Sequence, residues 1–258
     1  MFPVEVRGIK IGEETPKVCV PIVGSTEQDI LEQATTIQAL PVEIVEWRAD
    51  WFEKINDVFE VKRIVLKLRE ILGDKVILFT YRTIDEGGNG TLEPAEYKKL
   101  YMQISEIEDI DMIDLELFHG EEIIYDIIEK AKNYNKKIVI SNHDFEKTPS
   151  NEELIQRVDK MQEMKADIAK IAVMPNTKRD VLRLLDTTQE IHNRGMNCPI
   201  VSISMGELGV LSRISAEFYG SAITFGSVGK KSAPGQMDAE ELIHMLRMIH
   251  ENLQISNK

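Results

Sequence analysis

Two side chains have the types and the surroundings that covalent and proton-transfer catalysis require. Lys170 lies in the run DIAKIAV at 167–173, with isoleucine and alanine on both sides and no carboxylate within two residues. Burial disfavours the charged form of an amine, and an uncharged amine is the nucleophile that attacks a ketone to form a Schiff base. His143 closes the run KIVISNHD at 137–144, and an imidazole can carry protons in both directions near neutral pH. The pair predicts imine chemistry on a ketone, with His143 moving the protons.

Further polar side chains interrupt short apolar runs that are typical of buried strands. A buried charge without a partner is costly, so these residues either share a site or pair with one another. Side chains alternate between the two faces of a strand, and in each run the polar residues fall on one face. Five such runs together favour a site over pairs that only neutralise each other. The residues on these faces are Glu46 and Arg48, Thr80 and Arg82, Asp114 and Glu116, Ser141 and His143, and Lys170.

Eight short β-branched runs alternate with longer amphipathic segments, which is the pattern of parallel βα units. Strands are expected at 17–24, 42–50, 75–82, 111–117, 137–144, 167–173, 199–206 and 221–229. Helices are expected near 26–39, 57–72, 94–108, 120–134, 150–165, 177–194, 207–219 and 238–254. Eight repeats predict an α/β protein with the (β/α)₈ TIM-barrel fold, whose active site lies at the carboxyl ends of the strands.

Start signals support several of the helices. Ser25 with Gln28, Ser150 ahead of two glutamates, and Asp238 ahead of two more resemble N-caps with acidic first turns. Residues 1–16 are expected to form a short hairpin outside the repeat, across the floor of the barrel. An open, doubly wound sheet is the alternative fold, but it would normally carry a glycine-rich turn after the first strand.

Length and composition favour one soluble domain over residues 1–258. The formal net charge of -13 argues against nucleic acid and anionic membranes as partners. The amino terminus has no apolar signal-peptide core, which predicts a cytoplasmic protein. Cys19 and Cys198 lack metal-ligand spacing and are expected to be reduced and structural.

Taken in order along the chain, these runs resemble type I 3-dehydroquinate dehydratase, the Schiff-base dehydratase of the shikimate pathway of aromatic amino acid biosynthesis. The most specific stretch is DLEL, followed after twenty residues by IVISNHD. The resemblance covers the whole barrel. The matching segments are 46–50 (EWRAD), 81–88 (YRTIDEGG), 114–117 (DLEL), 138–144 (IVISNHD), 166–175 (ADIAKIAVMP), 204–213 (SMGELGVLSR) and 225–236 (FGSVGKKSAPGQ).

The resemblance implies a carbon–oxygen lyase that converts the small molecule 3-dehydroquinate to 3-dehydroshikimate without cofactor or metal. It implies that Lys170 forms the imine, His143 acts as general acid and base, Glu86 orients His143, and Arg213 binds the substrate carboxylate. Relatives are commonly dimers, so the resemblance also implies a homodimer. The loop at 226–236 would close over the substrate. The further contacts to substrate that the resemblance implies are Glu46, Arg48, Arg82, Ser232, Gln236, Met205 and Phe225.

The chain departs from some relatives at two peripheral positions, where Pro21 replaces a serine and Ile203 a methionine. The run GSVGKK could be taken for a phosphate loop, but it lacks the required spacing. Three other functions remain open from the residues alone. They are a class I aldolase on the same fold, a divalent-metal barrel using Glu46, Asp114, Glu116 and His143, and a non-catalytic barrel that binds small anions.

Overall fold

The computed structural model describes residues 3–255, and its elements follow the predicted alternation of strands and helices. The strands are β1 (Val4–Val6), β2 (Ile9–Ile11), β3 (Lys17–Ile22), β4 (Ile44–Arg48), β5 (Val76–Thr80), β6 (Met112–Glu116), β7 (Lys137–Asp144), β8 (Ile168–Val173), β9 (Ile200–Ser204), β10 (Ile223–Ser227) and β11 (Met237–Asp238). The α-helices are α1 (Glu27–Gln38), α2 (Val58–Leu72), α3 (Pro94–Ile104), α4 (Glu121–Asn133), α5 (Asn151–Glu163), α6 (Lys178–Asn193), α7 (Val210–Ile214), α8 (Ala216–Tyr219) and α9 (Ala239–Ile255).

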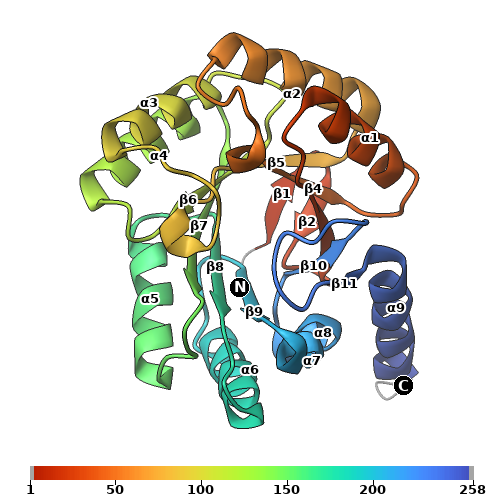
Figure 1. The fold of residues 1–258 in the computed structure, drawn as a ribbon. Helices are drawn as coiled ribbons and strands as arrows, with labels where there is room; N and C mark the ends of the chain where they lie inside the picture. Colours follow the sequence, from red (N-terminus) through yellow and green to blue (C-terminus); the bar gives the residue numbers. More distant parts are fainter. Residues whose placement is uncertain (1–2, 256–258) are drawn as a thin grey trace.

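The strands from β3 to β10 are parallel and curl into a barrel that the helices surround (Figure 1). Sequence neighbours pair from β3 to β9, and β10 returns to pair with β3. Between β9 and β10 the contact is a single bridge from Ile200 to Ser221, with the Ala222 amide donating to the Ile200 carbonyl at 2.8 Å. The predicted (β/α)₈ barrel is therefore confirmed, with its seam at β9 and β10. The two-residue strand β11 was not predicted, because two residues are too few to carry a pattern.

Alternating side chains divide the apolar core into an inner and an outer layer. Ile44, Leu78 and Ile168 belong to a cluster inside the barrel, whereas Val45 and Trp47 join the cluster between the strands and the helices. The residues with the parity of Ile44 and Ile168 therefore point into the barrel, as predicted. This parity brings the polar residues of β4 to β8 together inside it.

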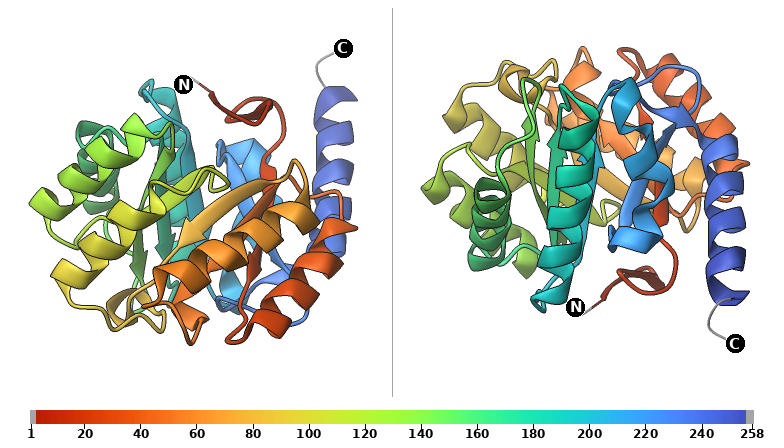
Figure 2. Two further views of the ribbon diagram at one scale, coloured as in Figure 1. Left: turned by 90° about the horizontal axis from the view of Figure 1, so that it is seen from above. Right: turned by 90° about the horizontal axis from the view of Figure 1, so that it is seen from below.

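A hairpin of β1 and β2 lies across the floor of the barrel, away from the loops that follow the strands (Figure 2). Val6 and Ile11 are buried and pack in the inner apolar cluster. The predicted hairpin is present at 4–11, and residues 1–2 of the predicted segment lie outside the described part of the chain. The hairpin thus closes the end of the barrel opposite the site.

Most helix starts agree with the sequence signals. Ser150 accepts a hydrogen bond from the Glu153 amide, and Asp238 accepts bonds from the next helix's first amides. The prediction for Ser25 is wrong, since Thr26 is the N-cap and forms a capping box with Asp29. The threonine has the extended backbone that places its hydroxyl at the amide three residues on.

The single helix expected at 207–219 is instead a 3₁₀ turn followed by α7 and α8. A Cβ on Gly209 would lie 2.0 Å from the Ser204 carbonyl oxygen, so the turn packs directly on the end of β9. The helix then breaks at Ser215, whose hydroxyl bonds the Leu211 carbonyl. Among the described helices, none has both the length and the apolar character needed to cross a bilayer.

Candidate functional site

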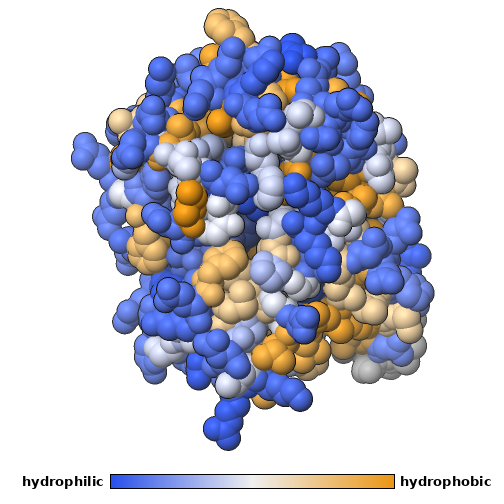
Figure 3. Space-filling model, in the orientation of Figure 1, coloured by the Kyte–Doolittle hydropathy of each residue, from blue (hydrophilic) through white to orange (hydrophobic). Residues whose placement is uncertain are grey.

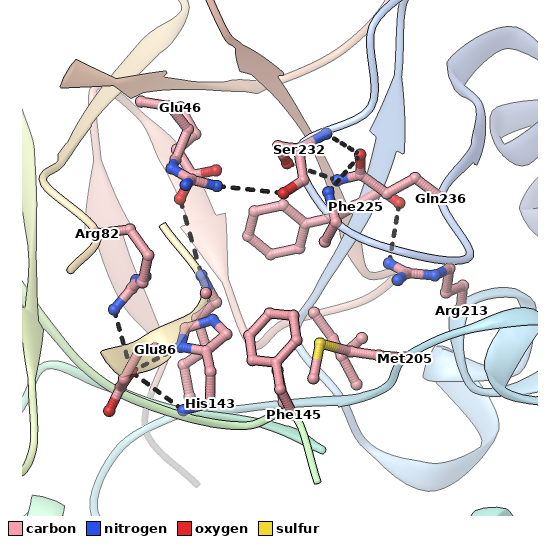
Figure 4. A pocket seen from close by; sticks show the side chains of 16 residues that line it. Glu46, Arg82, Glu86, His143, Phe145, Met205, Arg213, Phe225, Ser232 and Gln236 are labelled. Atoms are coloured by element: carbon pink, nitrogen blue, oxygen red, sulfur yellow. Dashed lines mark hydrogen bonds and ion pairs between the residues drawn. The ribbon is translucent and has the colours of Figure 1, made fainter. Parts of the chain in front are cut away.

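A cavity opens at the carboxyl ends of the strands, and all eleven site residues predicted from the sequence line it (Figure 4). Its walls come from the barrel strands and from the loops that follow them, including residues 232–236. Five lining residues were not assigned to the site from the sequence. They are Gly87, Phe145, Ala172, Ile203 and Ala233.

Lys170 projects from β8 into the barrel, and its side chain is only 6% exposed. Its Nζ lies 3.4 Å from Asp114 Oδ2, 3.8 Å from Glu46 Oε1 and 4.6 Å from the centroid of the Phe225 ring. The expected apolar surroundings exist along β8 but not around the amine, and that part of the sequence interpretation is wrong. One carboxylate comes from β6, two strands away in the sheet, and the other from β4 on the opposite side of the barrel, and both lie far away in the sequence.

His143, near the end of β7, is held by Glu86 from the turn after β5. Glu86 Oε2 lies 2.8 Å from His143 Nδ1, and accepts the backbone N–H of His143 at 3.1 Å (Figure 4). The side chains of Asn142 and Arg82 also donate to this carboxylate, at 3.0 and 3.2 Å. Four donors favour an ionised Glu86 and a proton on Nδ1. Nε2 is then the acceptor left for the cavity.

The electrostatic surroundings keep the imidazole uncharged. Burial, and after it the positive charges of Arg82, Lys170 and Arg48, holds the pKa of His143 well below its ordinary value. Burial acts to raise the pKa of Glu86 as well, but the Arg82 charge and the Asn142 hydrogen bond oppose that rise and favour the ionised carboxylate. A neutral imidazole with its second nitrogen free is a general base at neutral pH.

Arg82 is the counter-ion of a buried group of carboxylates. Its guanidinium lies 2.5 Å from Asp114, 3.0 Å from Glu116 and 3.2 Å from Glu86, with a side chain only 3% exposed. Burial opposes its charge, but these carboxylates outweigh burial and the pKa of Arg82 lies well above its ordinary value. Arg82 lines the cavity, and its contact with substrate stays a prediction.

Arg213 of α7 is a buried cation that finds no anionic partner among residues 3–255. Its Nη1 and Nη2 donate to the carbonyls of Phe225 and Pro234 at 3.3 and 3.1 Å, and Nε has no hydrogen-bond partner. Within the described residues no carboxylate lies in ion-pair range, and burial lowers the pKa of Arg213 to about 10. A guanidinium in this state fits a planar anion such as a carboxylate.

The loop after β10 covers the cavity and is held in place by polar contacts. Gln236 Oε1 accepts the Ser232 amide at 2.8 Å, and Gln236 Nε2 donates to the Ser232 hydroxyl at 2.9 Å. Arg48 donates to the Ser232 carbonyl at 3.4 Å while Asp50 holds its guanidinium with two bonds of 2.8 Å. Gly235 has φ +76°, and a Cβ there would lie 2.1 Å from the Gly206 oxygen. The loop therefore packs closely on the turn after β9.

Apolar side chains complete the cavity. Met205 and Phe225 line it as the sequence suggested, while Ile203 and Phe145, the latter from beyond the end of β7, add apolar surface (Figure 4). Phe145 carries no strand pattern, because it lies in the loop where alternation no longer fixes direction. Pro21 is buried in β3 opposite Glu46 and does not line the cavity.

The acidic residues do not converge as metal ligands. Within residues 3–255 no group of three or more His, Cys, Asp or Glu side chains could hold a metal ion. Glu116 instead accepts the amide and hydroxyl of Thr83 at 2.8 and 2.7 Å. The geometry therefore does not support the divalent-metal barrel.

Comparison with known proteins gives a consistent result. The sequence profile described as "Type I 3-dehydroquinase" matches residues 18–253. The chain is 43% identical to 3-dehydroquinate dehydratase of Clostridium botulinum over 250 residues, covering 97% of this chain and 98% of the relative. It is 44% identical to that of Bacillus subtilis over 247 residues, covering 96% and 97%.

Solved structures agree with the sequence matches. The type I 3-dehydroquinate dehydratase of Clostridium difficile, a structure with covalently modified comenic acid, superimposes with a TM-score of 0.95 at 42% identity, covering 98% of this chain and 100% of that one. The 3-dehydroquinate dehydratase of Geobacillus kaustophilus gives 0.93 at 36% identity, covering 96% of both chains. Fold, site and sequence thus agree, and the chain belongs to the type I 3-dehydroquinase family.

Proposed function

We propose that this chain is a 3-dehydroquinate dehydratase that removes water from 3-dehydroquinate to give 3-dehydroshikimate in the shikimate pathway. The observation that carries the proposal is a single cavity lined by three complementary groups. These are the Lys170 amine, the His143–Glu86 pair and the unpaired Arg213 cation. An aldolase or a silent anion-binding barrel would not need all three.

The amine of Lys170 attacks the C3 ketone, and the carbinolamine loses one water to give an iminium ion. The positive nitrogen withdraws electrons and acidifies the adjacent C2 hydrogen. Nε2 of neutral His143 takes that proton, and the electron pair moves into an enamine. The low pKa of His143 suits this step, because the base form is present at neutral pH.

His143 then returns the proton to the C1 hydroxyl, which leaves as water while the enamine collapses to a conjugated iminium. A second water hydrolyses this iminium, releasing the enone and the free Lys170 amine. Since imine formation releases one water and hydrolysis consumes one, the net change is loss of one water from the substrate. Glu86 stabilises the imidazolium while it holds the proton.

Binding is assigned to the remaining cavity residues. Arg213 takes the substrate carboxylate through two parallel hydrogen bonds, which gives the buried guanidinium its missing anion. The loop at 226–236 opens to admit the ring and closes over it, because Ser232, Ala233 and Gln236 of this loop line the cavity. The residues proposed to contact the hydroxyl-bearing ring are Glu46, Arg48, Arg82, Ser232, Gln236, Met205 and Phe225.

Borohydride trapping with 3-dehydroquinate tests this function. The expected result is a ring-derived mass on the peptide that contains Lys170, together with lost activity and, before trapping, absorbance of the enone product. Lys170→Met should abolish both the mass and the turnover, whereas the exposed Lys178→Met should change neither. Turnover that survives full trapping would exclude the imine route. Trapping without enone would favour another Schiff-base reaction.

We also propose that residues 1–258 form one catalytic domain, which acts in the cytoplasm without nucleic acid or membrane partners. The free thiols of Cys19 and Cys198 are in keeping with a reducing compartment.

A homodimer is proposed through the face of α7 to α9. Exposed apolar side chains gather where α7 and α8 approach α9 (Figure 3), and a second copy is the occupant proposed for them. Light scattering should give twice the chain mass, and Leu211→Glu should halve it. Phe59→Glu, an exposed position on α2, is the control that should leave the mass unchanged. The exposed apolar residues of this face are Leu208, Leu211, Phe218, Met245 and Met248.

A further inference from the structure

Asp114 contacts the amine of Lys170 from outside the cavity. Its side chain is 0% exposed, and Oδ2 lies 3.4 Å from Lys170 Nζ. Asp114 does not line the cavity, whereas Lys170 does. A ligand in the cavity therefore meets Lys170 and not Asp114, so any effect of Asp114 on catalysis passes through the lysine.

The orientation of this carboxylate is fixed by its other oxygen. Oδ1 accepts from Arg82 Nη2 at 2.5 Å and from the Ser141 hydroxyl at 2.6 Å. Arg82 Nη1 in turn donates to the Ser141 oxygen at 3.0 Å, which closes a small ring of hydrogen bonds. Ser141 is the direct neighbour of Lys170 across the β7–β8 ladder. With Oδ1 occupied, Oδ2 is the oxygen left to face the amine.

The same guanidinium holds the carboxylate that orients the histidine. Arg82 Nη1 donates to Glu86 Oε2 at 3.2 Å, and that oxygen lies 2.8 Å from His143 Nδ1. An unbroken series of contacts therefore runs from Lys170 through Asp114, Arg82 and Glu86 to His143. Each of the two reacting groups has its own buried carboxylate, and one arginine binds both carboxylates.

We propose that Asp114 is the positioning residue of Lys170, as Glu86 is of His143, and that Arg82 joins the two pairs into one electrostatic unit. The inference rests on the proposed imine at Lys170. Asp114 fixes Nζ at the cavity wall and places a negative charge 3.4 Å from it. The reactivity of the amine then depends on a carboxylate that does not line the cavity.

The Asp114 carboxylate is ionised, as this role requires. Burial acts to raise its pKa, but Arg82, Lys170 and the Ser141 hydroxyl outweigh burial, and the pKa of Asp114 lies below its ordinary value. Asp114 is therefore ionised throughout the neutral range. The cause is geometric, since three donors converge on a side chain that water does not reach.

The other groups that face Lys170 limit the expected effect. Glu46 of β4 lies 3.8 Å from Nζ and remains when Asp114 is changed. Cys19 of β3 is buried nearby, and because burial raises the pKa of its thiol well above the ordinary value it carries no charge. His143 lines the same cavity and is neutral. Removing Asp114 should thus reduce the negative charge that faces Nζ without removing all of it.

Reductive methylation with formaldehyde and cyanoborohydride measures the reactivity of the Lys170 amine without a substrate. Formaldehyde is small enough for the cavity, and peptide masses report Lys170 methylation as a function of pH. Asp114→Asn should move the pH midpoint of this reaction down by about 1–3 units, which is about 10- to 1,000-fold faster methylation below the midpoint. The kcat for 3-dehydroquinate should fall while KM stays close to that of the wild type.

Asp111→Asn is the matched control, because Asp111 pairs with Arg7 and Arg69 beside the start of β6, at the other end of the barrel. It should lower stability and leave the pH midpoint unchanged. A methylation midpoint in Asp114→Asn equal to that of the wild type overturns the proposal. A raised KM with unchanged kcat also overturns it, because that result would mean contact with substrate.

If Asp114→Asn does not fold, Ser141→Ala decides instead. It should move the midpoint in the same direction by a smaller amount, and an unmoved midpoint overturns the proposal.

Failure of the proposed function has a different outcome. Wild-type protein that does not turn over 3-dehydroquinate would refute the dehydratase activity. The methylation midpoints would still report whether Asp114 governs the amine of Lys170.

Discussion

Replacing Arg82 by methionine should destabilise the fold far more than losing an ordinary surface arginine. The guanidinium lies within 3.2 Å of three buried carboxylates, those of Asp114, Glu116 and Glu86. Breaking a buried ion pair by removing one partner typically costs about 3–5 kcal/mol, because the remaining charge has no counter-ion. For a chain of this size about 1 kcal/mol changes Tm by roughly 2–4 °C, so we expect Tm to fall by roughly 6–20 °C.

The loss should depend on pH in a specific direction. Arg82 is the strongest influence that lowers the pKa of Asp114, so this pKa should rise above its unfolded value once the guanidinium is gone. The folded variant would then bind more protons than its unfolded chain in the window above about pH 4. The stability deficit relative to wild type should therefore shrink as pH falls from 8 to 5.

Thermal unfolding followed by circular dichroism at pH 8, 6.5 and 5 provides the measurement. The control is Arg63→Met, since Arg63 pairs with Glu27 and Glu60 at the surface with a side chain 39% exposed. The control should change Tm only slightly at every pH. An Arg82→Met protein as stable as this control, or a deficit that grows on acidification, would refute the assignment of Arg82 as the counter-ion of the cluster.

Four further results are expected. Glu86→Gln should lower kcat by about 10- to 100-fold while borohydride trapping at the lysine persists, and unchanged kcat would contradict its role on His143. On the acid side of the pH profile, the midpoint of the decrease in kcat/KM should lie below pH 6.5, because the low pKa of His143 keeps its base form on acidification. A midpoint above pH 6.5 would contradict this. Arg213→Met should raise KM for 3-dehydroquinate by roughly 30- to 5,000-fold, from about 2–5 kcal/mol for a buried charge pair, and an unchanged KM would place the carboxylate elsewhere. Gly235→Ala should raise KM with little change in Tm, because the added Cβ would meet Gly206 and hold the loop open; normal KM would mean that the loop need not close.

Sequence reasoning identified the faces of the strands well, because strand alternation is local. Lys170 and His143 were assigned to one face from their parity, and the ladder places Ser141 beside the lysine. The same reasoning could not find Asp114 at the amine. Contacts between side chains of different strands inside a barrel depend on the stagger of the strands and on side-chain length. A segment of seven residues determines neither the stagger nor the partner's side chain.

The parts outside the strands were harder to predict, for a different reason. Phe145 and the break at Ser215 lie where the chain follows the shape of its neighbours rather than a period. The prediction of Ser25 as the N-cap was wrong for a similar reason. Both Ser25 and Thr26 suit an N-cap, and backbone geometry alone decides between them.

The β1–β2 hairpin has a consequence for how the enzyme turns over. Val6 and Ile11 pack in the inner apolar cluster, so within the described residues this end of the barrel is filled by side chains. If the proposed function holds, substrate, product and water exchange at the opposite end, beside the 226–236 loop. The rate of that exchange then sets an upper limit on kcat, however fast the chemical steps are.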